Sequence, residues 1–135
     1  MNRMQDQVQL AFRAFTFRKA LETKDQETYA SVLAEDVRLF TPIDVKPILG
    51  RETVVRVLGT VFELFQEFKY MEQLDGERLN VLWFNARIGD IPAEGVDLIR
   101  FNTAGQIVEF HVMMRPLKAL EALDREIRAR HGNHG

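Results

Sequence analysis

The sequence predicts an α+β fold in which helices near the N-terminus cover one face of a long, curved β-sheet. Apolar residues recur at helical spacing through most of the first half of the chain, whereas they alternate along the chain from residue 68 to residue 115. The helical pattern and the strand pattern thus occupy successive parts of the chain. This separation is typical of α+β folds, whereas helices and strands alternate in α/β folds. We therefore expect the order α-α-β-α-β-β-β-β-α, with a mixed or antiparallel sheet. Such a sheet twists, so helices closing it would give a cone with an apolar interior suited to a ligand.

The composition predicts one domain over residues 1–135 and limits its partners. The chain has 135 residues, 46% of them hydrophobic and ten of them Phe, which is enough for a core. It has no Cys, which excludes disulfides, thiolate metal sites and Cys nucleophiles. A formal net charge of −2 predicts no nucleic-acid or membrane partner. No apolar run follows the N-terminus, so we expect a cytoplasmic protein.

Two helices are expected first. Residues 4–23 carry two adjacent apolar stripes, so more than one face of this helix is expected to be buried. The stripes are Val8, Phe12 and Phe15, and Leu10, Ala14, Phe17 and Leu21. A second helix over 25–34 begins with Asp25, a residue type that favours the N-cap position.

A short strand and a third helix follow. Residues 37–41 read as a strand that stops at Pro42, and Pro47 keeps the following loop irregular. Gly50 introduces a helix over 51–66. Its buried stripe is Val54, Val57, Leu58, Val61, Phe62 and Phe65.

Four strands and a last helix complete the chain. The strands are expected at 68–74, 79–88, 94–101 and 106–115, so that residues 94–116 contain the last hairpin. Turn sequences Asp75-Gly76, Gly89-Asp90 and Asn102-Thr103-Ala104-Gly105 separate the four strands. Residues 117–129 read as an amphipathic helix, and 131–135 as a disordered tail.

Alternation along the strands predicts which side chains face the interior. Asp97 shares one face of its strand with Ile99 and Phe101, and the next strand has an even-numbered apolar face. An even-length last loop would add Val108, Phe110, Val112 and Met114 to the Asp97 face, whereas an odd-length loop would reverse this. The even-numbered apolar face consists of Leu82, Phe84, Ala86 and Ile88.

Asp97 is therefore the candidate catalytic residue, since an ionised Asp on an apolar face needs a partner, a raised pKa or a function. Either it is a neutral acid that donates a hydrogen bond to a ligand carbonyl or hydroxyl, or it is a structural carboxylate held by a Tyr, an amide or a water. Thr41 and Tyr70 are its expected polar companions. The expected ligand-binding residues are Phe17, Thr41, Leu58, Tyr70, Phe84, Ala86, Ile99, Phe101, Phe110, Val112 and Met114.

Four segments resemble the nuclear transport factor 2-like superfamily, particularly its SnoaL-like branch. They are Leu33-Ala34-Glu35-Asp36-Val37, Gly50-Arg51-Glu52, Gly95-Val96-Asp97-Leu98-Ile99-Arg100-Phe101 and Gly105-Gln106-Ile107-Val108-Glu109. The resemblance extends from about Val8 to Leu123 and implies a cystatin-like roll. It does not imply one activity, because the superfamily includes isomerases, dehydratases, cyclases, epoxide hydrolases and proteins that are not enzymes.

The resemblance to ketosteroid isomerase within this superfamily implies an electrophile without a base. Asp97 falls where that enzyme has a protonated Asp. Thr41 falls at the position of its general base, and Phe17 at that of its oxyanion-binding Tyr. Val112 takes the position of the Asp base of SnoaL-like cyclases.

The resemblance also implies a homodimer formed through the opposite face of the sheet. Trp83, Arg87, His111 and Met113 alternate onto this outer face, which commonly forms a dimer interface in the fold. We interpret His111 as an interface residue rather than a base. Asp44, in the loop after the first strand, reads either as a displaced base or as a solvated turn residue.

Three functional hypotheses follow. The first is a cofactor-independent enzyme that acts on a hydrophobic, cyclic carbonyl compound by isomerase-, cyclase- or dehydratase-type acid–base chemistry. The second is a carrier that binds an apolar small molecule without turnover. The third is a dimerisation module with a vestigial pocket. We expect no metal ion and no cofactor, since His131 and His134 have no carboxylate nearby.

Overall fold

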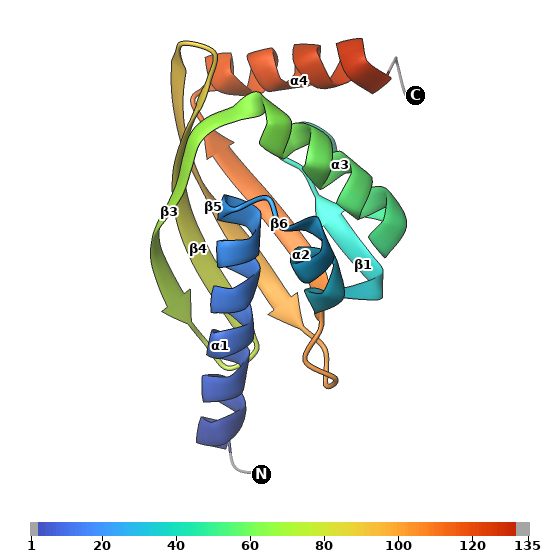
Figure 1. Ribbon diagram of the computed structural model, residues 1–135, viewed down its shortest axis with the longest axis vertical. Coiled ribbons are helices and arrows are strands. Elements are labelled where there is room, and N and C mark those ends of the chain that lie inside the picture. Colours follow the sequence, from blue (N-terminus) through green and yellow to red (C-terminus); the bar gives the residue numbers. More distant parts are fainter. Residues whose placement is uncertain (1–2, 132–135) are drawn as a thin grey trace.

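The computed structural model describes residues 3–131, so residues 132–135 of the expected tail lie outside the described residues. The α+β fold is confirmed (Figure 1). The elements are α1 (Arg3–Glu22), α2 (Gln26–Val32), β1 (Leu33–Phe40), β2 (Ile48–Leu49), α3 (Arg51–Leu64), β3 (Phe65–Asp75), β4 (Leu79–Ile88), β5 (Ile91–Phe101), β6 (Ile107–Arg115) and α4 (Leu117–His131).

The described strands form one curved, mixed sheet in the order β2-β1-β6-β5-β4-β3. Neighbouring strands are antiparallel except β1 and β6, which run parallel. The helices α1, α2 and α3 cover one face of this sheet, and α4 lies across one end (Figure 1). No helix among residues 3–131 combines the length and apolar character needed to cross a membrane.

Only one of the two apolar stripes of α1 is buried. The stripe that begins at Leu10 packs into the core through Ala14, Phe17 and Leu21. Val8 and the rest of the other stripe are exposed. The expectation that both faces would be buried was wrong, because the helix meets the sheet on one side only.

The second helix is shorter than the sequence predicts. Asp25 is its N-cap, accepting hydrogen bonds from the backbone N of Thr28 at 3.2 Å and from its Oγ1 at 2.7 Å. The chain is already extended at Leu33, which pairs with Ile107 of β6. Strand pairing therefore ends this helix early, and β1 begins four residues before the expected position.

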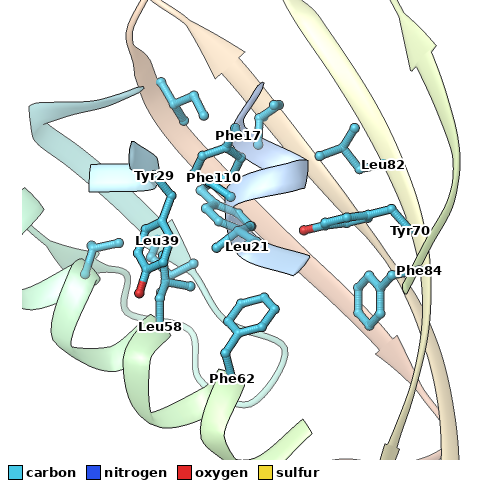
Figure 2. Packing of buried hydrophobic residues seen from close by; sticks show 14 of the residues in the cluster. Phe17, Leu21, Tyr29, Leu39, Leu58, Phe62, Tyr70, Leu82, Phe84 and Phe110 are labelled. Atoms are coloured by element: carbon cyan, nitrogen blue, oxygen red, sulfur yellow. The ribbon is translucent and has the colours of Figure 1, made fainter. Parts of the chain in front are cut away.

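The core lies between the helices and the inner face of the sheet (Figure 2). Leu82, Phe84, Ala86 and Ile88 of β4 are buried, as alternation predicts. Phe110, Val112 and Met114 of β6 pair with Ile99, Asp97 and Gly95, so they share the Asp97 face. The loop over 102–106 has an odd length, which was expected to reverse this face, but only Val108 departs from it. A bulge shifts the register between Arg100 and Phe101, and Ile107 is the buried residue there.

Candidate functional site

Asp97 lies near the middle of β5 and faces the interior. Its neighbours across the sheet are Leu82 of β4 and Val112 of β6, and only 3% of the residue is exposed. Long antiparallel pairing on both sides holds β5 in register, which fixes the direction of the carboxyl group. Asp97 and Asn80 are the two buried polar residues among residues 3–131.

Tyr70 of β3 reaches the same point from across the sheet. Its hydroxyl donates a hydrogen bond to Asp97 Oδ2 at 2.5 Å, and the residue is 2% exposed. Figure 2 shows the ring projecting inward from the sheet, near Leu82 and Phe84. The structure thus brings together Asp97 and one of its two expected polar companions.

Burial raises the pKa of both groups. Burial raises the pKa of Asp97 from 3.8 to about 7, although the hydrogen bond from Tyr70 lowers it in part. Burial, and then the negative charge of Asp97, raise the pKa of Tyr70 well above its ordinary value of 10.0. Near neutral pH the carboxyl group can therefore hold or release a proton, whereas the tyrosine hydroxyl keeps its own.

Two α1 residues that the sequence analysis missed lie beside this pair. The Arg18 guanidinium lies 5.9 Å from the centre of the Tyr70 ring, and its buried Nε has no hydrogen-bond partner. Glu22 accepts a hydrogen bond from the backbone N of Tyr70 at 2.8 Å. Their spacing of four residues places Arg18 and Glu22 on one side of a helix. The spacing of Arg18 and Glu22 in the sequence does not indicate whether this side of α1 faces the sheet or the solvent.

Aromatic side chains fill the interior around Asp97. Phe17 packs edge-on against Phe110, with ring centres 5.5 Å apart. Phe84 packs against Phe68 at 5.0 Å and lies 6.2 Å from the Tyr70 ring. Apart from Thr41, the predicted ligand-binding residues are thus part of the core. Those that are buried are Phe17, Leu58, Tyr70, Phe84, Ala86, Ile99, Phe101 and Phe110, whereas Val112 and Met114 are half-buried.

Thr41, the other expected companion of Asp97, serves the loop after β1. Its Oγ1 accepts hydrogen bonds from the backbone N of Ile43 at 3.4 Å and of Asp44 at 3.3 Å. This is how a Thr hydroxyl closes a short turn. Asp44 itself is exposed. The structure gives Thr41 no hydrogen bond to the Asp97–Tyr70 pair.

Two hollows are found on the surface, and neither reaches Asp97 or Tyr70. One, of about 610 Å³, lies between α2 and α3. The other, of about 460 Å³, lies where the ends of β4 and β5 meet the end of β6, and Ala86 contributes to its wall. Among residues 3–131, no group of three or more His, Asp or Glu side chains is placed to hold a metal ion.

The outer face of the sheet carries an apolar band with a charged border. One cross-strand row joins Leu74, Val81, Leu98, His111 and Phe40, and the next joins Glu72, Trp83, Val96 and Met113. The His111 ring stacks on Phe40 at 4.2 Å. Trp83 and Met113 are 39% and 53% exposed. Arg87 also lies on this side, 3.9 Å from Glu67.

The border of this band is centred on Glu109 of β6. Its carboxylate accepts from Arg38 of β1 at 2.6 Å and lies 3.6 Å from Arg100 of β5. His111 Nε2 is 3.1 Å from the same carboxylate. The hydrogen bond to His111 and the neighbouring positive charges lower the pKa of Glu109.

Comparisons with solved structures give two clear relatives. An uncharacterized protein with a cystatin-like fold from Silicibacter pomeroyi DSS-3 is 36% identical, with a TM-score of 0.83, and the match covers 87% of this chain and 84% of that one. A steroid delta-isomerase from Pseudomonas aeruginosa is 34% identical, with a TM-score of 0.85, and the match covers 91% of both chains.

A more distant structure shares the fold. It is an NTF-2 like protein of unknown function from Burkholderia xenovorans LB400, 15% identical with a TM-score of 0.70, and the match covers 78% of this chain and 82% of that one. No family model matches the chain, and no curated protein does.

Proposed function

The chain belongs to the nuclear transport factor 2-like superfamily, and on that basis we propose that it binds a small hydrophobic carbonyl compound through Asp97. One observation carries the proposal: the buried hydrogen bond between Tyr70 and Asp97, in which the carboxyl group has a pKa of about 7. A neutral carboxylic acid in an apolar interior is a strong hydrogen-bond donor to a carbonyl oxygen. Tyr70 holds the acid in position.

The chemistry of the surroundings supports an apolar ligand. The strand neighbours of Asp97 are Leu82 and Val112, and the helix side of the interior adds Phe17 and Leu58. A related protein is named a steroid delta-isomerase, and steroids are hydrophobic polycyclic compounds. The ligand class proposed for this chain is therefore a cyclic carbonyl compound.

The residues present support binding more than isomerisation. Isomerisation requires a base as well as an acid. Thr41, at the expected position of the base, closes its own turn, and Phe17, at that of the second oxyanion donor, has no hydroxyl. We therefore propose a carrier that needs no cofactor. Because Asp97 is 3% exposed, we propose that the helices move away from the sheet to admit the ligand.

A thermal-shift series tests this function. Pairs of cyclic ketones and the matching hydrocarbons are added to the parent, Asp97→Asn, Asp97→Ala and the control Asp90→Asn, which makes the same change at an exposed turn. A ligand that binds only the folded state raises the melting temperature. We expect ketones to stabilise the parent and the control, Asp97→Asn to respond less, and Asp97→Ala least. Equal shifts for ketone and hydrocarbon, or for all variants, would remove Asp97 from a ligand site.

A second measurement separates carrier from enzyme. An isomerase that forms an enol or enolate removes a hydrogen next to the ketone carbonyl, and NMR detects its replacement by deuterium when the removed proton exchanges with the solvent. We expect the parent to exchange them no faster than Asp97→Asn. Faster exchange by the parent would contradict the carrier and favour cofactor-independent acid–base catalysis.

The outer face favours a second function, dimerisation. Its apolar band has exposed Trp83 and Met113 near its centre and the charges of Arg38, Glu109 and Arg100 at one border, the arrangement typical of an interface. We propose that two copies pack these sheet faces together. Trp83→Glu should halve the mass of the particle in light scattering, and an unchanged mass would argue against this interface.

A further inference from the structure

The exposed side of α1 carries a continuous apolar stripe that the functions above do not use. Met4, Val8, Phe12 and Phe15 are 73%, 64%, 71% and 46% exposed. Their spacings of four, four and three residues align them along one side of the helix. We refer to these four residues as the α1 stripe.

Residues 3–131 leave the α1 stripe uncovered. The first residue of α1 that is buried is Leu10, and the N-terminal turns of the helix extend beyond the strands (Figure 1). These turns are held by a hydrogen bond from Gln7 to the backbone O of Asp75 at 3.1 Å and by an ion pair of Arg3 with Glu77 at 3.1 Å. Both contacts are exposed, so they contribute little stability. A short helical projection of this kind is marginal unless its apolar side packs against something.

The charges around the stripe narrow the choice of partner. Between Met4 and Phe15 the charged residues are Asp6 and Arg13, and at 3.6 residues per turn both project from the other side of the helix. Arg13 is engaged there with the backbone O of Gly105. The residues beside the stripe include Gln5, Gln9 and Thr16, which are uncharged. Basic groups lie at one end of the stripe, where the Arg18 guanidinium is 5.4 Å from the centre of the Phe15 ring and Lys19 follows. The rest of the stripe lacks the basic border that nucleic acid or anionic lipid requires.

We propose that the α1 stripe pairs with the α1 stripe of a second copy, with the two helices antiparallel. A two-fold axis near the middle of the stripe places Val8 of each copy against Phe12 of the other, and no charges face each other there. At about 200 Å² for each fully exposed side chain, the four residues expose about 500 Å² per copy. Complete burial of the four residues on both copies would remove about 1,000 Å², the lower limit for a specific interface, so assembly depends on concentration.

This pairing is independent of the proposed sheet-face dimer. Phe17 of α1 packs on Phe110 of the inner sheet face, whereas Trp83 lies on the outer face, so the two surfaces are on opposite sides of the sheet. One copy can engage both partners at once. If their axes meet at right angles, two kinds of two-fold contact close into a tetramer, a common symmetry for homo-oligomers.

Particle mass tests the proposal. Light scattering over a range of concentrations compares the parent with Phe12→Glu, the control Gln9→Glu, Trp83→Glu and the double variant Phe12→Glu/Trp83→Glu. Phe12 and Gln9 are both exposed on α1, but only Phe12 belongs to the stripe. We expect a twofold loss of mass for Phe12→Glu, none for Gln9→Glu, and monomers for the double variant.

The results separate the two interfaces. A mass for Phe12→Glu equal to that of the parent overturns the α1 pairing, whatever Trp83→Glu does. Halving by Phe12→Glu alone, with no effect of Trp83→Glu, supports the α1 pairing and contradicts the sheet-face dimer.

Cross-linking tests the direction of the helices. The chain has no Cys, so an introduced Cys is the single reactive thiol. In the Trp83→Glu background, a short bismaleimide should cross-link the Val8→Cys positions of the two copies, because Val8 lies near the proposed axis. The Lys19→Cys positions lie far from this axis and should not be cross-linked. Cross-linking of both variants would indicate parallel helices, and cross-linking of neither would overturn the pairing.

Discussion

At the scale of single residues, the structure makes Asp97 a source of pH-dependent stability. Its pKa is about 7 in the folded protein and 3.8 in the unfolded chain, so between these values the folded state binds the extra proton. Folding stability must then fall as pH rises through this window and become level above it. The slope contributed by one such group is at most about 1.4 kcal/mol per pH unit.

Asp97→Asn should remove this slope. Asn at position 97 cannot ionise, so the free energy of unfolding of the variant should vary less between pH 4 and pH 7. The stability of the variant relative to the parent should therefore increase as the pH rises. Urea unfolding at several pH values measures both quantities. Parallel curves for the parent and the variant would show that Asp97 has no raised pKa.

Tyr70→Phe should move the titration of Asp97 further upward. The hydrogen bond from Tyr70 lowers the pKa of Asp97, so its loss raises that pKa, and an unpaired buried polar group costs about 1–3 kcal/mol. Carboxyl carbon NMR follows the titration. Tyr29→Phe removes the other tyrosine hydroxyl and should leave the Asp97 titration unchanged.

Alternation predicted the direction of Asp97, whereas Tyr70 was expected only as one of two polar companions. Period-two patterning determines which face a strand residue occupies, and β4 and β5 pair without interruption. In β3 the register shifts between Gln66 and Lys69 and again between Tyr70 and Glu72. Bulges reset the alternation, so the pattern did not decide between Thr41 and Tyr70 as the companion of Asp97.

At the scale of elements, two glycines should respond in opposite ways to the same substitution. A Cβ on Gly95 of β5 would lie 2.6 Å from the Phe84 ring and against the backbone O of Met113, whereas a Cβ on Gly59 of α3 meets nothing within 4 Å. Gly95→Ala should therefore destabilise the protein by about 1–3 kcal/mol. Gly59→Ala should stabilise it by up to about 1 kcal/mol, because Ala favours a helix. Urea unfolding compares them, and the same sign for both would contradict this packing.

The short or interrupted elements were those that the sequence could not predict. β2 has two residues, Ile48–Leu49, which are too few to show a period. α2 ends at Val32 because Leu33 joins β6, a contact between residues far apart in the chain. The longer elements α1, α3, β4 and β5 were predicted because each repeats its period several times.

At the scale of the whole molecule, the described elements share one core, which predicts cooperative unfolding. Helices α1–α4 and strands β1 and β3–β6 all contribute buried residues to it. Fluorescence of Trp83, the single tryptophan, and far-ultraviolet circular dichroism should therefore give coincident urea transitions. Separate midpoints would indicate that part of the chain folds independently.

The fold was predicted as a whole, but the open interior was not found. A pattern shows which side chains face inward, whereas an open cavity depends on whether their volumes fill the space. Here Phe17, Phe84 and Phe110 fill it, together with Tyr70. The sequence contains these side chains, but their mutual packing depends on the curvature of the sheet.

Glu109 makes the stability of one part of the sheet sensitive to acid. Its carboxylate links β1, β6 and β5, and β1 and β6 are the one parallel pair among the described strands. Because its pKa is lowered in the folded protein, its contribution is present above the ordinary value of 4.5 and is lost as the pH falls. Acidification should therefore weaken the pairing of β1 with β6 first. Backbone amides of β1 should then lose protection from hydrogen exchange before those of β4.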